Sequence, residues 1–457
     1  MRGLLNRPAM EAAEQFRRLI LDNPSLYLDD CYAMAEEMAK SNAKYHGEVI
    51  DWLYQPFFFD DQDRSTFEEI CRLVSGITSK LSEAYPGDAG LRRLYGFDRT
   101  ADELIRIDPG YSHSAPMARL DLFFSRSAPA KFCEFNTDGT SGMNEIGELD
   151  RVFIGTRIFR EIEDRFTVRR YEFVDSWIDT LLELFREWGG RSGPVIAISD
   201  WDGEGVREEF EAFRTAMESR GLRCMITDPR HFTYSRSGAG GRLMLKGTQI
   251  DLVYRRAVNF ECFDRADEIK PLIEAYRNGD VCMVGPFRSQ LLHNKNVFRV
   301  LRHPDVLSLF TPEEQALIRD RIPQTLRLTE EEVRQCSVVR EREAWLIKPE
   351  DRYAAKEVIA GRDCTKVQWQ RLLEEKSRSG GYLLQEFCNH GEDRFLSCFD
   401  RSYGSFEEVT CRNVIGVYMY NGKFSGVYTR VGTSSIIASL WHCFMLPGLF
   451  VGLRTGR

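Results

Sequence analysis

Apolar side chains recur every three or four positions through most of the first hundred residues, the spacing that places them on one face of a helix. The clearest such segment is FEEICRLVSGITSKLSEAY. The helices that this spacing predicts span residues 9–20, 31–40, 67–85, 150–166 and 174–190. Gly189-Gly190 is expected to end the last of them.

Between residues 194 and 287, short apolar runs alternate with amphipathic segments. The expected strands are 194–201, 223–227, 251–258 and 281–287, and the expected helices are 205–221 and 262–279. Alternation of strands and helices implies a mainly parallel sheet covered by helices. SRSGAGG (235–241) is expected to form a flexible turn inside this unit.

From about residue 290 the pattern changes. A helix is expected to begin at LLHNKNVFRVL, and the later elements are strand 344–349, helix 365–380, strand 382–387 and two strands within 412–432. Asn421-Gly422 is a typical hairpin turn between those last strands. The most apolar stretch, 434–453, contains His442 and Pro447, so we expect a buried strand and loop there rather than a membrane span.

The segments MARLDLFF and KFCEFN predict two strands around a Ser/Pro turn. If the turn is centred between positions 127 and 128, Asp121 lies opposite Glu134 and Arg119 lies opposite Asn136, all on one face. Two carboxylates facing each other across a ladder repel unless a cation lies between them. Carboxylate and amide oxygens are ligands that Mg²⁺ accepts, usually together with phosphate oxygens. We therefore expect a Mg²⁺ site at Asp121, Glu134 and Asn136, with an ordinary hairpin that exposes a hydrated polar face as the alternative.

Three lysines are candidates for binding phosphate. Lys348 ends the apolar run WLI and precedes a proline, so its ammonium group is expected to project from a rigid strand into a cleft. Lys356 lies in the following loop, and Lys295 lies where a helix is expected to begin. For each of them the alternative is a solvated surface lysine.

The strand YLLQEF offers Gln385, Glu386 and Phe387, which could bind the edge and the face of an adenine. A plain half-buried strand is the competing interpretation. Arg430 is expected at a strand end beside Gly432 and two hydroxyl residues, a setting that suits stabilisation of phosphoryl or oxyanion charge.

Arg255 and Arg256 are expected on opposite faces of one strand, where one of them could bind a substrate carboxylate. The turn SDWDGEG (199–205) follows a strand end, but its acidic residues favour a structural role. The sequence contains no GxSxG, HExxH, DxDxDG or P-loop motif.

Composition narrows the class of protein. The chain has 457 residues and a mass of 52.9 kDa, enough for two or three domains, and a net charge of −8 with a pI of about 5.6 argues against nucleic acid as a partner. Twelve scattered cysteines without a CxxC pair predict reduced, mostly buried thiols and a cytoplasmic protein. The N-terminal segment predicts an amphipathic helix rather than a signal peptide.

A series of short motifs, taken in chain order, resembles that of circularly permuted ATP-grasp proteins of the glutathionylspermidine synthase-like group. The motifs are RLD, EFN, NK, IKP with a following lysine, LQE and YTRVG. The resemblance runs from about residue 100 to the C-terminus. It implies an α/β (α+β) ATP-grasp fold with a preceding α/β substrate domain and N-terminal helices. It also implies ATP and Mg²⁺ as cofactors and an ATP-dependent carboxylate–amine ligase that forms an amide bond through an acyl-phosphate.

The resemblance also implies roles for individual residues. Asp121, Glu134 and Asn136 would hold Mg²⁺ against the ATP phosphates. Lys295, Lys348 and Lys356 would bind phosphate, Gln385, Glu386 and Phe387 would lie at the adenine, and Arg119 and Arg430 would assist the transferred phosphoryl or acyl group. The implied division is a helical region at 1–100, a metal-binding hairpin and helix at 101–170, a substrate domain at 171–290 and a nucleotide-binding region at 291–457.

One segment departs from the family pattern. Related chains often carry a lid resembling DGYGGKGV, whereas this chain reads DRYAAKEV (351–358), which lacks the glycines that allow backbone N–H groups to approach phosphate. A catalytically impaired ATP-binding protein or an interaction module is therefore the alternative function, and a metal-dependent hydrolase is a third. The first hundred residues do not resemble the amidase domain of bifunctional relatives, so no amidase activity is expected. Carboxylate and amine substrates, small or peptidic, are the expected partners, with neither nucleic acid nor membrane, and the sequence does not indicate the oligomeric state.

Overall fold

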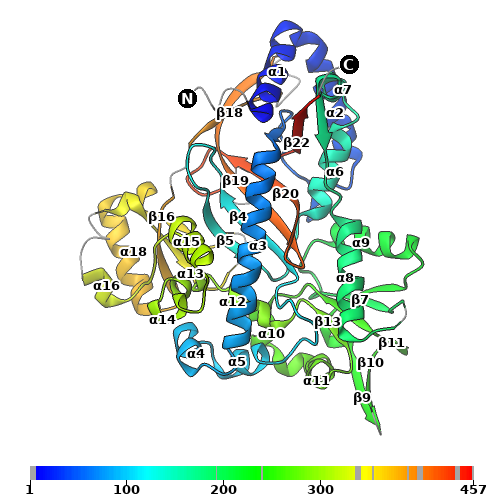
Figure 1. The fold of residues 1–457 in the computed structure, drawn as a ribbon, viewed down its shortest axis with the longest axis vertical. Coiled ribbons are helices and arrows are strands. Elements are labelled where there is room, and N and C mark those ends of the chain that lie inside the picture. The colour runs from blue at the N-terminus through cyan, green and yellow to red at the C-terminus, as the bar shows by residue number, and fades with distance from the viewer. Residues whose placement is uncertain are drawn as a thin grey trace.

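The structure is a computed structural model that describes residues 7–191, 193–237, 240–334, 341–352, 355–388, 391–398, 405–437 and 443–454. In the middle of the molecule lies an antiparallel sheet whose strands come from distant parts of the chain (Figure 1). Its order is β21 (Cys443–Leu446), β20 (Lys423–Gly432), β19 (Glu407–Tyr420), β4 (Met117–Phe123) and β5 (Lys131–Asn136), with β18 (Asp393–Ser397) also paired to β19. The predicted turn between β19 and β20 is confirmed, because Asn421 and Gly422 both have positive φ, as a two-residue hairpin turn requires.

The two faces of β4 differ in chemistry because successive side chains point to opposite sides of a strand. Ala118, Leu120 and Leu122 are fully buried in the core that also contains the apolar side of α3 (Asp61–Ala84). Arg119 and Asp121 alternate with them and therefore face the other side of the sheet. The sequence pattern of this strand thus reserves one face for packing and one for polar chemistry.

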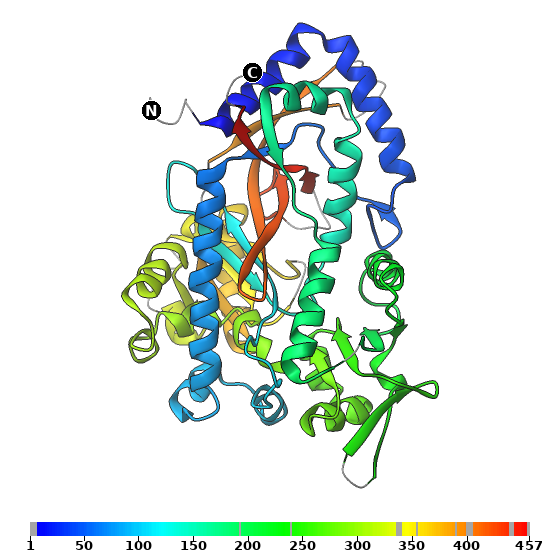
Figure 2. The ribbon, with the colours of Figure 1, turned by 45° about the vertical axis from the view of Figure 1, so that its right-hand side comes forward.

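Helix α3 crosses the apolar side of the central sheet (Figure 2). It begins with a capping box, in which the Asp60 carboxylate accepts the backbone N–H of Asp63 while the Asp63 carboxylate accepts the N–H of Asp60. Its buried apolar residues recur at helical spacing and include Phe67, Ile70, Cys71, Val74, Ile77 and Leu81. The prediction of a helix here is confirmed.

Other helices also precede the parallel sheet along the chain. They are α1 (Pro8–Asp22), α2 (Pro24–Lys40), α4 (Ala89–Tyr95), α5 (Arg99–Ile105), α6 (Met143–Phe153), α7 (Arg157–Arg165) and α8 (Val174–Trp188). The prediction of one helix over 150–166 is wrong, since Gly155 separates α6 from α7 and Thr156 caps α7. Gly189, at a φ of 112°, ends α8 as predicted.

The alternating segment forms the expected parallel sheet. Its order is β13 (Cys282–Val284), β12 (Leu252–Arg255), β7 (Ile196–Ser199) and β8 (Cys224–Thr227), and the pairs are parallel. Its helices are α9 (Arg207–Ser219), α10 (Asn259–Asp264) and α11 (Lys270–Arg277). Of the segment expected to be a flexible turn (235–241), the described residues belong to the strands of a hairpin, β9 (Thr233–Ser237) and β10 (Gly240–Leu245), extended by β11 (Thr248–Gln249). Residues 238–239 lie outside the described residues.

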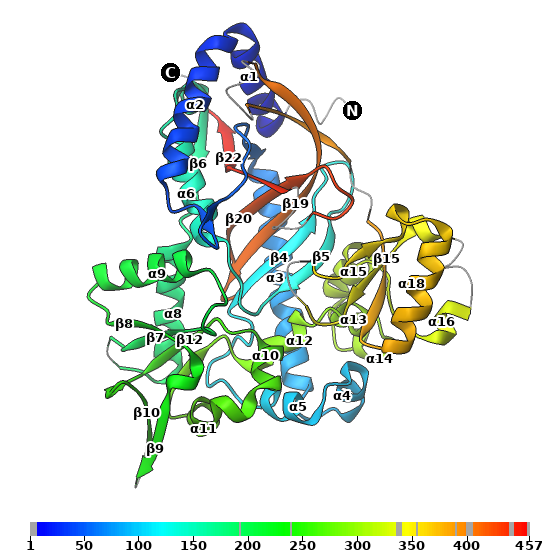
Figure 3. The ribbon, with the colours of Figure 1, turned by 180° about the vertical axis from the view of Figure 1, so that it is seen from behind.

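A third sheet contains the strand that carries Lys348 (Figure 3). Its antiparallel order is β14 (Thr325–Arg327), β17 (Tyr382–Glu386), β15 (Trp345–Pro349) and β16 (Ile359–Ala360), and Trp369 and Leu373 of α18 (Lys366–Ser379) pack on it. The helices nearby are α12 (Gln290–His293), α13 (Val297–Leu301), α14 (Pro304–Leu307), α15 (Pro312–Arg321) and α16 (Glu330–Arg334). The helix expected to begin near 291 is thus interrupted between α12 and α13.

The apolar C-terminal stretch is built into sheets. β21 joins the central sheet, and β22 (Gly448–Leu453) lies between β3 (Phe57–Phe59) and β6 (Phe166–Arg169), while β1 (Lys44–Tyr45) and β2 (Glu48–Val49) form a small hairpin. Of the 434–453 stretch, residues 438–442 lie outside the described residues. Among the helices in the described ranges, none is both long and apolar enough to cross a bilayer.

The expectation of reduced thiols is wrong at one place. Cys31 of α2 and Cys398, just after β18, form a disulfide that joins positions 367 residues apart. Sequence spacing gave no sign of this pair, because only the fold brings α2 beside β18. The other described cysteines are free thiols, and Cys336 lies outside the described residues.

We expect reduction of this disulfide to lower the midpoint of thermal unfolding. A cross-link over so long a loop restricts the unfolded chain and typically contributes about 2–5 kcal/mol to the free energy of unfolding. Calorimetry with and without dithiothreitol measures the change. Cys31→Ser combined with Cys398→Ser should remove the effect of the reductant. A thiol titration that finds all twelve cysteines reactive in unfolded, unreduced protein would contradict the pairing.

Candidate functional site

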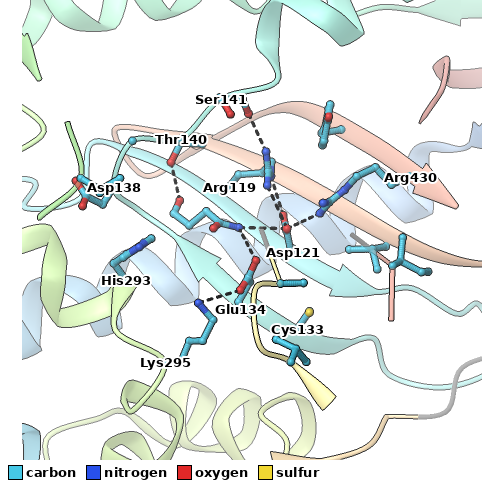
Figure 4. Close-up of a pocket in the computed structure, with 18 of the residues that line it drawn as sticks. Arg119, Asp121, Cys133, Glu134, Asp138, Thr140, Ser141, His293, Lys295 and Arg430 are labelled. Atoms are coloured by element: carbon cyan, nitrogen blue, oxygen red, sulfur yellow. Dashed lines mark hydrogen bonds and ion pairs between the residues drawn. The ribbon is translucent and has the colours of Figure 1, made fainter. Parts of the chain in front are cut away.

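A cavity of about 230 Å³ lies where the three large sheets meet, on the polar face of β4 and β5 (Figure 4). The sequence-predicted residues that line it are Arg119, Asp121, Glu134, Asn136, Arg256, Lys295, Lys348, Gln385, Phe387 and Arg430. Arg255, Lys356 and Glu386 lie outside this lining. Residues separated by more than 300 positions therefore converge on one space.

The predicted register of the hairpin is confirmed. Asp121 pairs with Glu134 and Arg119 pairs with Asn136, and a bulge then shifts the pairing by one residue beyond Asp121. The bulge places Cys133 in the cavity lining next to Glu134. On the other side of β4, Asp121 pairs with Gly416 of β19. A Cβ at Gly416 would lie 2.6 Å from Arg119 Cδ and 2.9 Å from Asp121 Oδ1, so the absence of a side chain there makes room for both groups.

Asp121 is held between two guanidinium groups. Arg119 donates from Nε to Oδ1 at 2.8 Å and from Nη2 to Oδ2 at 3.3 Å, and Arg430 of β20 pairs with Oδ2. Both arginines also lie over the ring of Tyr428, at 4.8 and 5.2 Å from its centroid. Only 1% of the Asp121 side chain is exposed, so these ion pairs lie in a medium of low dielectric constant and are strong.

Glu134 is the more accessible of the two acids, with 25% of its side chain exposed. Its Oε2 lies 3.3 Å from Nζ of Lys295, and the Asn136 amide donates to Glu134 Oε1 at 3.4 Å and to Asp121 Oδ2 at 3.1 Å. Burial alone would raise the pKa of Glu134, but the charges of Lys295, Lys348, Arg430 and Arg119 outweigh burial and lower this pKa to about 2. The acid is therefore ionised at neutral pH.

Lys348 projects from the end of β15 into the cavity, as the sequence predicts. Its ammonium group donates to the backbone oxygen of Cys133 at 3.1 Å and lies 5.9 Å from the ring centroid of Phe298. Burial lowers the pKa of Lys348, against the opposing effect of the Glu134 charge. Lys295, in the short link between α12 and α13, donates to the backbone oxygen of Arg352 at 2.6 Å, so it also contacts the start of the lid segment.

The strand predicted to bind adenine divides between two environments. Gln385 and Phe387 line the cavity, although the Gln385 amide already donates to Thr325 Oγ1 at 3.0 Å and Phe387 stacks against Arg362 at 3.9 Å. Glu386 points elsewhere and accepts the backbone N–H of Gln324. An adenine could contact the first two side chains but not the Glu386 carboxylate.

The lid segment has an unusual backbone. Ala355 and Glu357 adopt positive φ angles of 52° and 61°, at two of the positions where related chains carry glycine. This conformation costs an ordinary residue about 1 kcal/mol or more. Lys356 between them is exposed, and Glu357 pairs with Lys376 of α18. Tyr353 and Ala354 lie outside the described residues.

The two consecutive arginines have different surroundings. Arg255 is completely buried, where it pairs with Asp138 at 2.9 Å and donates to Asn259 and to the backbone oxygen of Gly285. These bonds hold the parallel sheet against the loop after β5, so Arg255 has a structural position. Arg256 lines the cavity but pairs with Glu209 at 2.9 Å. A substrate carboxylate would have to share Arg256 with Glu209.

Acidic groups gather at the other end of the cavity. Asp200 and Glu204, in the turn expected to be structural, line it together with Glu261 of α10. Burial raises the pKa of Asp200 to about 6, and burial with the charges of Asp200 and Glu204 raises that of Glu261 to about 7. Glu145 of α6 also lines the cavity, and burial with the charge of Glu209 raises its pKa to about 8. The cavity therefore has a cationic end and an acidic end.

The donor set fits Mg²⁺ that arrives with phosphate. At the cationic end of the cavity, four cations (Arg119, Lys295, Lys348 and Arg430) lie beside two acidic side chains (Asp121 and Glu134), so basic groups outnumber acidic groups there by two. A bare divalent ion would add to this excess, whereas phosphate groups would neutralise it. The described residues hold no cluster of three or more His, Cys, Asp or Glu side chains suited to a metal. Two carboxylates and one amide oxygen would thus need phosphate oxygens to complete the shell of Mg²⁺.

Sequence reasoning missed much of the lining. The missed residues are Tyr45, His46, Asp138, Thr140, Ser141, Glu145, Glu261 and Tyr428. The run TDGTSG directly after Asn136 was an available signal, because a polar, glycine-containing loop at a strand end often lies at a site. Tyr45, His46 and Glu261 carry no such local signal, since tertiary packing alone brings them to the cavity.

Comparison with known proteins supports the fold. No family model and no curated protein matches the sequence. The structure is similar to that of a glutathione synthetase-like effector from Globodera pallida in its apo form, with a TM-score of 0.62 and 13% identity over 93% of this chain and 97% of the other. At this identity the similarity shows the fold alone, and it confirms the predicted α/β ATP-grasp fold.

Two further matches are more distant. A protein from Methylobacillus flagellatus, provisionally described as a gamma-glutamylcysteine synthetase, has a TM-score of 0.41 at 12% identity over 82% of this chain and 86% of the other. The ATP-grasp ligase PsnB, in complex with a minimal precursor, has a TM-score of 0.25 at 16% identity over 55% of this chain and 88% of its own.

The raised pKa of Glu145 predicts how stability depends on pH. The Glu145 carboxyl has a pKa of about 8 in the folded state and about 4.5 when unfolded. It does not change the free energy of unfolding below pH 4.5, where both states are protonated. Between pH 4.5 and pH 8 it lowers this free energy, because only the unfolded state loses its proton. The same holds for Asp150, which is also buried in α6 with a pKa of about 8 but lies outside the cavity lining. We expect Glu145→Gln and Asp150→Asn each to reduce the loss of thermal midpoint between pH 5 and pH 8. Midpoints that change in parallel with wild type would show that these acids ionise normally.

Proposed function

We propose that this chain is an ATP- and Mg²⁺-dependent carboxylate–amine ligase that forms an amide bond through an acyl-phosphate. The observation that carries the proposal is the cavity that Asp121, Glu134 and Asn136 of the central sheet line together with Lys295 and Lys348. The surplus of positive charge at this end of the cavity suits a polyphosphate. The shared fold with a glutathione synthetase-like protein supports this reaction class over a hydrolase.

The roles of the residues follow from their positions. Lys295 and Lys348 would bind ATP phosphates as compact charges. Gln385 and Phe387 would contact the adenine. Arg119 and Arg430, both buried and preoriented by Asp121, would stabilise charge on the transferred phosphoryl group without reorganisation.

Asp121, Glu134 and Asn136 would hold Mg²⁺, which when bound neutralises phosphate charge. The substrate carboxylate would attack the γ-phosphate, and an amine would then displace phosphate. Carboxylate and amine substrates would enter from the acidic end, past Arg256 and Glu145.

The arrangement along the chain supports a permuted ATP-grasp protein of the glutathionylspermidine synthase-like group. The acidic hairpin, β4 and β5, precedes the lysine strand β15 in the chain, and β4 pairs with β19 near the C-terminus. We propose the four-part division at 100, 170 and 290, in which 101–170 and 291–457 together form the nucleotide-binding core.

A nucleotide-binding protein without turnover is the alternative. The lid motivates it, because Ala355 and Glu357 occupy backbone conformations better suited to glycine. The fold shared with a glutathione synthetase-like protein does not favour it over the ligase. The two functions differ in phosphate release, which a panel of carboxylates and amines with Mg·ATP would measure.

Glu134→Gln tests the metal assignment. Omitting Mg²⁺ should lower the wild-type affinity for a non-hydrolysable ATP analogue. In Glu134→Gln the ratio of the affinities with and without Mg²⁺ should be smaller by roughly tenfold or more, which corresponds to the loss of one charge-assisted interaction. Calorimetric titration gives both affinities. Glu350→Gln is the matched control, since its side chain is 18% exposed and paired with Arg327 but lies outside the cavity lining. A Glu134→Gln protein with an unchanged Mg²⁺ effect would refute the assignment. Asp121→Asn is less suitable, because it leaves two buried guanidinium groups without their partner.

Lys348→Ala tests the phosphate site. The loss of a charge-assisted hydrogen bond should weaken ATP binding by about 1.5–3 kcal/mol. Exposed Lys366→Ala, on the helix that covers the same sheet, is the control for a general loss of positive charge. Equal affinities of the two variants would place Lys348 outside the nucleotide site.

A further inference from the structure

Glu145 is a buried acid of the cavity whose side chain is not used by the ion pairs described above. It lies in the first turn of α6 and is 1% exposed. Its Oε2 has no hydrogen-bond partner among the described residues, although it lines the same cavity as Arg119 and Arg430. A buried carboxyl oxygen without a partner is costly unless the group is neutral or awaits a ligand.

The groups around Glu145 explain why its Oε2 has no hydrogen-bond partner in the part of the chain that the structure describes. Arg119 and Arg256 are the cations that act on it, and they are already paired with Asp121 and Glu209. Glu209 Oε2 accepts the backbone N–H groups of Gly142, Met143 and Asn144, so the start of α6 is also satisfied. The phenol groups nearby are Tyr418, which donates to the backbone oxygen of Ser141, and Tyr428, which donates to Met445 Sδ.

The proposed reaction needs a proton acceptor at this place. A primary amine is an ammonium ion near pH 7 and cannot attack until it loses a proton. Asp121 and Glu134 are engaged with cations and are expected to face the phosphates. Asp200, Glu204 and Glu261 lie at the acidic end of the cavity. Glu145 lines the same cavity as Arg119 and Arg256, and its Oε2 is not engaged by either arginine.

We propose that Glu145 accepts the proton that the amine substrate must lose before it attacks. The inference rests on the proposed ligase function. The ammonium N–H bond breaks and its proton passes to the Glu145 carboxylate. The freed nitrogen then forms a bond to the acyl carbon, the bond from that carbon to the phosphate oxygen breaks, and the nitrogen's second proton leaves with the phosphate as HPO₄²⁻. The Glu145 carboxyl has a pKa of about 8, which lies close to neutral pH and so allows it to accept and release a proton there.

The test uses two nucleophiles that differ in protonation. Hydroxylamine is largely neutral at pH 7 and captures an acyl-phosphate as a hydroxamate without a base, whereas ethylamine and glycine are ammonium ions. Wild type, Glu145→Gln and Asp150→Asn are incubated with Mg·ATP, a panel of amino acid and short-peptide carboxylates, and each nucleophile. Asp150→Asn is the matched control, because it removes an acid of similar burial and pKa on the same helix but outside the cavity lining.

In Glu145→Gln, we expect hydroxamate formation within about threefold of wild type and amide formation reduced by roughly 100-fold or more, the usual contribution of a general base. The wild-type amide rate should rise with ionisation of Glu145 and level off above about pH 8, whereas in Glu145→Gln the residual rate should keep rising to pH 9 with the fraction of free amine. Asp150→Asn should behave as wild type in both reactions. Amide formation that survives the substitution, or an equal loss of both products, would overturn the role of Glu145 alone. Absence of hydroxamate and of phosphate release in wild type would overturn the ligase function and the inference with it.

Discussion

The site depends on one electrostatic constraint, the clamp of Asp121 between Arg119 and Arg430 on the polar face of the central sheet. Because Asp121 and both arginines are buried, water does not replace the carboxylate as the partner of either guanidinium group. The direction of each guanidinium group is therefore fixed. The clamp joins two strands whose paired residues, Asp121 and Arg430, are 309 positions apart in the chain. It also leaves Lys295 and Lys348 as additional positive charge beside Glu134, which is why this end of the cavity suits an anion.

Local periodicity predicted the most important geometry. Because side chains alternate along a strand, one assumption about the turn placed Asp121 opposite Glu134, and the structure confirms this pairing. The parallel sheet and the strand ending in Lys348 follow from apolar runs in the same way. Short breaks such as Gly155 were missed, since a single residue hardly changes helical spacing over the 150–166 segment.

Other features depend on tertiary packing that local sequence does not encode. Arg255 and Arg256 look equivalent in sequence, yet one is enclosed by Asp138 and Asn259 while the other reaches the cavity. The need for Gly416 appears only when β19 lies beside β4. The Cys31–Cys398 pair likewise requires positions 367 residues apart to meet. Glu145 is notable only because its Oε2 is buried with no hydrogen-bond partner among the described residues.

The central claim is that the surplus positive charge is balanced by a metal–polyphosphate complex lying between the acids and the lysines. A crystal structure with Mn²⁺ and a non-hydrolysable ATP analogue tests this most directly, since anomalous scattering locates the ion without assumption. The account predicts the ion in contact with Asp121, Glu134 and phosphate oxygens, and the phosphates within hydrogen-bond distance of Lys348. A nucleotide bound elsewhere, or an ion distant from both acids, would contradict it.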